Sequence, residues 1–186
     1  MNIILENIPK LFKASILTIE LTLLSLFIGI FIGLFFAILR LSKNKLLFNI
    51  SYYYSFIFRG TPLLVQIFII YFGLAQLEFI RESFLWLVLK NPFACAILAF
   101  SLNTGAYTSE IFRSGFEKVD KNIIEAGNAL GISNFYIFIK IKLPIAIKQS
   151  LPAYGNEMIL MLKGTSLAST ITLIDLTGAA KHIIST

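Results

Sequence analysis

Polar side chains interrupt the apolar runs of this sequence at helical spacing, and their chemistry suits contact with a polar solute. One face of a helix is formed by residues at i, i+4, i+7 and i+11, namely Asn103, Tyr107, Glu110 and Ser114. Asn156 and Glu157 form a polar pair in a later run. Such groups can replace the water that a polar solute loses inside a membrane. Asn103, Tyr107, Glu110, Asn156 and Glu157 are therefore candidates for contact with polar groups inside a bundle of helices.

Each of these residues has a structural alternative. The asparagines and the tyrosine could hydrogen-bond one helix to another. Glu110 could form an ion pair with Arg113, three residues on, and Glu157 could pair with a neighbouring helix.

An intramembrane enzyme is a second class of function, with Glu20, Glu110 and Glu157 as acids. The sequence contains no HExxH motif, no paired aspartate motif and no compact serine–lysine arrangement. His182 is the single histidine and Cys95 the single cysteine, which excludes a histidine-rich metal cluster and an internal disulfide. We expect no catalytic residue, no metal site and no cofactor bound by this chain. A channel or a pure assembly protein is a third alternative.

The elements that position these residues are membrane helices. The 186 residues are 57% hydrophobic, and the mean hydropathy of +0.82 exceeds that of a soluble domain of this size. Apolar runs long enough to cross a bilayer recur with little strand-like alternation. We predict an all-α polytopic bundle with four crossings, over residues 15–39, 63–77, 92–112 and 151–173.

Three regions qualify this pattern. Residues 48–58 are aromatic and predict an interfacial helix. The run 63–77 is short for a crossing if it begins at Pro62, so we expect its helix to begin before the proline. Residues 175–185 predict a short helical tail.

The distribution of cations predicts the topology. The net charge of +6 comes from lysines and arginines that flank apolar runs, without a long basic tract that would suit nucleic acid. Arg40, Lys43 and Lys45 form a compact basic loop, which the positive-inside rule places in the cytoplasm. The N-terminus is then expected outside, and the polar interruption at residues 113–144 inside.

That interruption predicts a compact helical elbow. Asp120 or Asn122 can cap a first helix, which ends at Gly131, where glycine permits a positive φ. Ser133 can cap a second helix, which we expect Pro144 to limit. The elbow carries more apolar residues than a solvated loop, which suits a partner surface. From the pattern alone, a connecting loop that folds back on its own bundle is the more common alternative. A channel or assembly protein would not need such an element.

The spacing in this elbow resembles the EAA loop of the permease subunits of bacterial ABC importers. The family pattern is Glu-Ala-Ala, three residues, glycine, nine residues, isoleucine, one residue, Leu-Pro. The matching residues are Glu125, Ala126, Gly127, Gly131, Ile141, Leu143 and Pro144. Gly127 replaces the usual third alanine, a change that can loosen a helix by about 1 kcal/mol.

Further blocks are similar to the polar amino acid subfamily, of the histidine, glutamine and arginine type. They comprise residues 58–66, 105–107, 110–113 and 151–157, with Lys163, Thr165 and Ser166. The resemblance therefore covers the chain from about residue 15 onward. It implies one permease domain over residues 1–186, of the type I importer kind, with the coupling loop at 113–144.

The resemblance also implies partners and a role. In this family a cytoplasmic ATPase holds the EAA elbow in a cleft and passes its closure to the membrane helices. ATP and magnesium would bind that ATPase, since this chain has no GxxxxGK[ST] loop. The family further implies a second permease subunit, as a homodimer or heterodimer, and an extracytoplasmic solute-binding protein. We expect a bacterial inner membrane protein that imports glutamine or cationic amino acids. The resemblance makes the seven matching elbow residues its ATPase-coupling residues. It also makes the polar residues named above the candidates for its substrate pathway, namely Asn103, Tyr107, Glu110, Asn156 and Glu157.

Members of the family usually continue past a segment like residues 175–184 into one more spanning helix. The sequence stops at Thr186, so we expect this last helix to be missing, either because the sequence is a fragment or because the permease is truncated.

Overall fold

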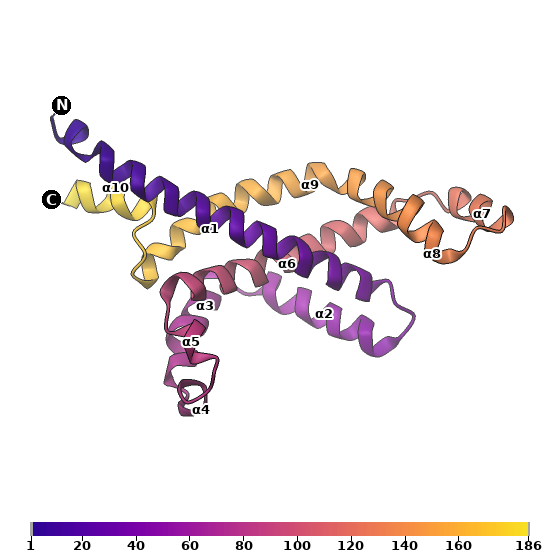
Figure 1. Cartoon of the computed structure of the whole chain (residues 1–186), viewed down its shortest axis with the longest axis horizontal. Helices are drawn as coiled ribbons and strands as arrows, with labels where there is room; N and C mark the ends of the chain where they lie inside the picture. Colours follow the sequence, from indigo (N-terminus) through magenta and orange to yellow (C-terminus); the bar gives the residue numbers. More distant parts are fainter. Residues whose placement is uncertain (1, 186) are drawn as a thin grey trace.

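The computed structural model describes residues 2–185, which form helices and no strand (Figure 1). The outermost positions of the predicted 1–186 domain, Met1 and Thr186, lie outside the described residues. The two termini lie together at one end of the molecule, and the predicted elbow extends from the other (Figure 1). The prediction of an all-α bundle is confirmed.

Helices α1 (Asn2–Arg40) and α2 (Lys45–Gly60) pack together after a short basic turn. Asn44 caps α2 by accepting a hydrogen bond from the backbone N–H of Leu46 at 2.8 Å. The Ser51 hydroxyl donates to the carbonyl of Phe36 at 2.7 Å, which ties α2 to α1. The predicted interfacial helix, residues 48–58, lies within α2 and packs directly against α1.

A sharp corner follows α2. Here the prediction that the helix of the second crossing begins before Pro62 is wrong. Helix α3 (Leu63–Phe68) begins after Pro62 and not before it, and the segment Leu63–Gln76 is bent by 103° from α2. Thr61 is extended, with φ −111° and ψ 144°, because the proline ring disfavours helical backbone at the preceding residue. The segment continues as a π-helical turn, Ile69–Gly73, and a 3-10 turn, Leu74–Gln76.

Helix α6 (Pro92–Glu117) is the central element of the bundle. It follows the short helices α4 (Glu78–Arg81) and α5 (Trp86–Leu89), and it packs against α1, α2, α3 and α9. Asn91 caps it by accepting from the backbone N–H of Phe93 at 2.9 Å. The helix predicted over 92–112 is confirmed. Its buried polar side chains are Ser101, Asn103, Thr104, Thr108 and Ser109.

Glycines allow α1 and α6 to cross closely. A Cβ on Gly33 would lie 2.5 Å from Cβ of Thr108, and one on Gly29 would lie 2.3 Å from Cγ2 of Thr104. On the other side of the contact, a Cβ on Gly105 would lie 2.8 Å from Cγ2 of Ile32. The GxxxG spacing of α1 therefore serves a helix interface.

The remaining helices form the elbow and the return to the membrane. They are α7 (Lys121–Ala129), α8 (Asn134–Ile137), α9 (Leu143–Gly164) and α10 (Leu176–Ser185). A π-helical turn, Phe138–Lys142, joins α8 to α9 without a break, so the prediction that Pro144 limits the helix is wrong. Pro144 lies in the first turn of α9, where the ring is tolerated. The helical tail is confirmed as α10.

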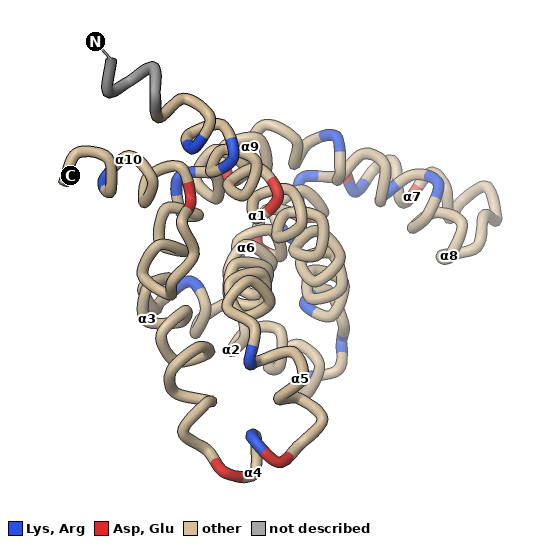
Figure 2. Tube along the Cα trace, turned by 60° about the vertical axis from the view of Figure 1, so that its left-hand side comes forward, with Lys and Arg blue, Asp and Glu red and all other residues tan. Residues whose placement is uncertain are grey.

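Length and apolar composition identify the membrane segments only partly. In the described chain, Asn7–Arg40 is long and apolar enough to cross alone, and two bent pairs of helices qualify if each pair is one span. These pairs are Lys45–Gly60 with Leu63–Gln76, and Asn134–Ile171 with Leu176–Ser185. Charged residues gather at the α4 turn and along the α7 arm, whereas the tube between them is mostly uncharged (Figure 2).

Candidate functional site

The elbow is built as a pair of short helices with a defined cap at each turn. The Asp120 carboxylate accepts a hydrogen bond from the backbone N–H of Asn122 at 2.9 Å and begins α7. Gly131 ends that helix with φ +74°, and its N–H donates to the carbonyl of Asn128 at 3.0 Å. Ser133 caps α8 through the N–H of Tyr136. Local hydrogen bonds therefore define where both helices of the elbow begin and how the turn between them is closed.

Gly127 packs the two arms of the elbow together. It is buried, and a Cβ there would lie 3.1 Å from Cδ1 of Ile137 and 3.9 Å from Cδ1 of Ile141. An alanine would require Ile137 to move by a few tenths of an ångström. Glycine at this position thus suits the isoleucine that faces it.

The outer surface of the elbow is apolar and exposed. Leu130 is 80% exposed, Phe135 69% and Tyr136 59%. A surface of this kind at the tip of an arm favours a protein partner over solvent. Among the predicted coupling residues, Glu125, Ala126, Gly131 and Pro144 are exposed, Ile141 and Leu143 are half-buried, and Gly127 is buried.

The base of the elbow is fixed to α6 and α9. The rings of Phe116 and Phe138 stack with centroids 5.8 Å apart. A Cβ on Gly115 would lie 2.2 Å from Oγ of Ser150, whose hydroxyl donates to the carbonyl of Ile111 at 3.2 Å. The elbow is therefore in direct contact with two long helices.

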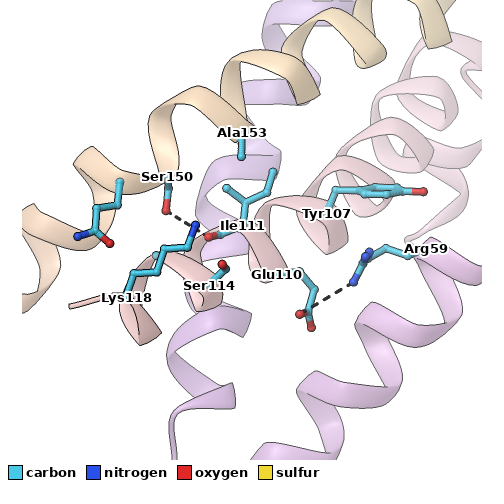
Figure 3. A pocket seen from close by; sticks show the side chains of 10 residues that line it. Arg59, Tyr107, Glu110, Ile111, Ser114, Lys118, Ser150 and Ala153 are labelled. Carbon is cyan, nitrogen blue, oxygen red and sulfur yellow. Dashed lines mark hydrogen bonds and ion pairs between the residues drawn. The ribbon is translucent and has the colours of Figure 1, made fainter. Parts of the chain in front are cut away.

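Part of the polar stripe on α6 lines a cavity of about 250 Å³ between α2, α6 and α9. Tyr107, Glu110 and Ser114 face this space from α6 (Figure 3). Arg59 enters from α2, and its guanidinium carbon lies 5.3 Å from the ring centroid of Tyr107. Lys118 completes a lining with two cations and one carboxylate, which suits a zwitterionic solute.

Asn103 lies outside this cavity and holds the corner after α2. Its amide donates to the carbonyl of Phe58 at 3.0 Å and to Oε1 of Gln66 at 3.1 Å. The Gln66 amide in turn donates to Phe58 at 2.8 Å and to the hydroxyl of Thr61 at 2.8 Å. For Asn103 the structure supports the alternative of a helix-to-helix hydrogen bond.

Asn156 and Glu157 point to different surroundings although they are adjacent. Asn156 is exposed on α9. Glu157 is buried and accepts a 2.8 Å hydrogen bond from the hydroxyl of Thr104 on α6. Within residues 2–185 no lysine or arginine forms an ion pair with Glu157, so its carboxylate has a hydroxyl partner and no bound cation.

Glu110 forms the predicted ion pair with Arg113, at 2.7 Å, and two further pairs that sequence reasoning missed. Arg40 from α1 and Arg59 from α2 also approach its carboxylate. Gln66 and Thr104 were missed as well. Thr104 directly follows Asn103 and so lies off the polar stripe. No spacing rule links Gln66 to Asn103 or Thr104 to Glu157, because each pair is far apart in the sequence.

Comparison with known proteins agrees with this architecture. Residues 29–183 match the family model described as binding-protein-dependent transport system inner membrane component. The nopaline transport system permease protein of Agrobacterium fabrum is 50% identical over 184 residues, covering 98% of this chain and 76% of that protein. The arginine ABC transporter permease protein of Haemophilus influenzae is 41% identical over 186 residues, covering 100% and 78%.

A solved structure supports the same conclusion. The crystal structure of an amino acid ABC transporter with histidines is 36% identical to this chain and superposes with a TM-score of 0.85. The superposition covers 98% of this chain and 81% of that one. This chain belongs to the binding-protein-dependent transport system inner membrane component family.

Proposed function

We propose that this chain is the membrane-spanning permease subunit of an ATP-driven importer of polar amino acids, and that residues 113–144 are its coupling loop. The observation that carries the proposal is the elbow, whose exposed apolar surface and fixed caps suit a cleft in a partner. An intramembrane enzyme or a channel would leave this element without a role.

The coupling mechanism follows from the way the elbow is attached. A closing ATPase that grips Leu130 and Phe135 would move α7 and α8 as one unit, because Gly127 packs against Ile137. The Phe116–Phe138 stack and the Gly115–Ser150 contact would pass that displacement to α6 and α9. In this proposal the exposed residues Glu125, Ala126 and Gly131 belong to the surface of the elbow that contacts the ATPase.

The partners in this proposal are three kinds of protein. A cytoplasmic ATPase binds ATP and magnesium and hydrolyses the nucleotide. A second permease subunit, identical or related, completes the pathway, and an extracytoplasmic solute-binding protein delivers the substrate. This chain spans a bacterial inner membrane four times, with its N-terminus outside and the basic turn after α1 in the cytoplasm.

The proposed substrate is a cationic amino acid, with glutamine as the alternative. Glu157 supports this choice, because a buried carboxylate without a cationic partner can bind the positive group of a solute. A relative named for arginine transport is consistent with it. In this proposal Tyr107 and Glu110 line the inner part of the pathway, Asn156 and Glu157 lie near its middle, and Asn103 positions the corner that borders it.

The test is uptake by the whole transporter. The chain would be co-expressed with an ATPase, a second permease and a solute-binding protein from the same genome, purified and reconstituted into liposomes. We expect uptake of labelled arginine that requires both internal ATP and the binding protein. Uptake without ATP would indicate a channel. ATP-dependent uptake of glutamine but not arginine would overturn the substrate class and keep the transporter.

A further inference from the structure

Glu110 is the meeting point of three helices near the base of the coupling elbow. Its carboxylate accepts a 2.7 Å hydrogen bond from Nε of Arg113, one turn along α6. Nη2 of Arg40, the last residue of α1, lies 3.4 Å from Oε1. Nη1 of Arg59, close to the end of α2, lies 4.0 Å from Oε2 (Figure 3). One carboxylate thus connects α1, α2 and α6.

Aromatic rings hold the two distant arginines in place. The guanidinium carbon of Arg40 lies 4.8 Å from the ring centroid of Phe48 and 4.7 Å from that of Tyr52, both on α2. Arg59 lies over Tyr107 of α6. Each arginine therefore comes from one helix, rests on a ring of a second and points at Glu110.

The charges make Glu110 difficult to replace by a neutral group. The side chain of Arg40 is 12% exposed and that of Glu110 17%, so water screens this pair weakly. The buried Nη1 of Arg40 has no hydrogen-bond partner among the described residues. Without the Glu110 carboxylate, three guanidinium groups would converge on one point, and in the ion pairs of the described residues Glu117 balances only Arg113.

The position of this cluster links the elbow to the corner after α2. Arg113 also pairs with Glu117, in the last turn of α6 before the elbow. Seven residues before Glu110, Asn103 holds the corner through Phe58 and Gln66. The same side of α6 thus grips α2 at two places about two turns apart.

We propose that Glu110 is a positioning residue that makes the α1–α2 hairpin and the corner at Thr61–Pro62 follow α6 when the elbow moves. This role rests on the proposed function as a coupled permease. A role in packing alone would lower the amount of assembled transporter and would leave each assembled transporter as efficient as before. A role in transmission lowers the amino acid transported per ATP hydrolysed.

Glu110→Gln tests this role, with Glu82→Gln as the matched control. The control makes the same chemical change at an exposed side chain at the end of α4, outside both the elbow and the Glu110 cluster. Both variants would be reconstituted with the ATPase and binding protein, and uptake and ATP hydrolysis measured on equal amounts of complex. We expect Glu110→Gln to lower the ratio of transport to hydrolysis by at least about fivefold, the lower end of typical coupling between sites. The control should stay near the wild type.

Two further variants keep the proposal open to refutation. If Glu110→Gln does not assemble, Arg59→Gln removes one arm of the cluster and leaves Arg40 and Arg113 paired, and we expect a smaller fall in the same ratio. Glu110→Asp, which keeps the charge, should recover part of the loss. A wild-type ratio in Glu110→Gln, or in Arg59→Gln where that variant is used, would overturn the role of Glu110. Wild-type liposomes that show no ATP-dependent uptake would instead overturn the proposed function.

Discussion

Oγ1 of Thr104 donates a 2.8 Å hydrogen bond to Oε1 of Glu157, across the contact between α6 and α9. The two residues are 53 positions apart in the sequence. The same threonine lies against Gly29 of α1, where a Cβ would approach its Cγ2 to 2.3 Å. The buried carboxylate is therefore positioned at the junction of three helices.

Replacing Glu157 by glutamine should impair transport more than assembly. Glutamine keeps the shape of the glutamate side chain and can still accept the hydrogen bond from Thr104. It lacks the negative charge that would attract a bound cation. We expect transport of arginine to fall by at least about tenfold, from the loss of a charged hydrogen bond of about 1.5–3 kcal/mol. Uptake and the amount of complex in the membrane would be measured together. Glu82→Gln, at an exposed residue, is the control, and equal losses of uptake and assembly would make Glu157 structural.

The turn of the elbow should depend on the backbone conformation of Gly131. At φ +74° a β-branched side chain is strained by about 1–3 kcal/mol, whereas asparagine adopts this conformation more readily. We expect Gly131→Val to reduce co-purification of the ATPase and Gly131→Asn to retain most of it. Because the position has open space around it, a clash cannot explain a difference between the two. Equal co-purification of the ATPase with both variants would contradict a shape-dependent contact.

The crossing of α1 and α6 should not accept a larger residue at Gly33. An added Cβ would lie 2.5 Å from Cβ of Thr108 and 3.1 Å from the carbonyl oxygen of Gly105. We expect Gly33→Ala to lower the stability of the purified complex by about 1–3 kcal/mol, despite the better helix propensity of alanine. Thermal unfolding in detergent would measure the change. Gly155→Ala, where no atom lies within 4 Å of the added Cβ, should leave the stability unchanged or slightly raised.

Asn103 should be needed to hold the corner after α2. In Asn103→Leu the side-chain oxygen of Gln66 loses its donor, while the carbonyl of Phe58 keeps the bond from Gln66. One unpaired buried acceptor predicts a loss of about 1–3 kcal/mol, localised at residues 58–66. Hydrogen exchange of these residues should become faster than in Asn49→Leu, a change at an exposed residue of α2. Unchanged exchange would mean that packing alone holds the corner.

The elbow was largely predictable because its geometry is local. Asp120, Gly131 and Ser133 act on backbone groups two or three residues away, so side-chain chemistry and spacing were enough to place the caps. Pro144 was misjudged, because a proline within the first helical turn needs no break. At Thr61–Pro62 the rule that proline disfavours helical backbone at the preceding residue was correct. The helix was nevertheless predicted to begin before Pro62, because residues 63–77 alone are short for a crossing.

By itself the sequence determined the helical membrane class, the coupling elbow and the period of the polar face on α6, since each depends on composition or on contacts within a few residues. Only the tertiary structure decided which polar groups meet. The packing of α1 against α6 at Gly29 and Gly33 brings Arg40 to Glu110, and the 103° bend after α2 brings Gln66 to Asn103. These partners are 37 or more positions apart, and no local pattern encodes the angle at which two helices cross.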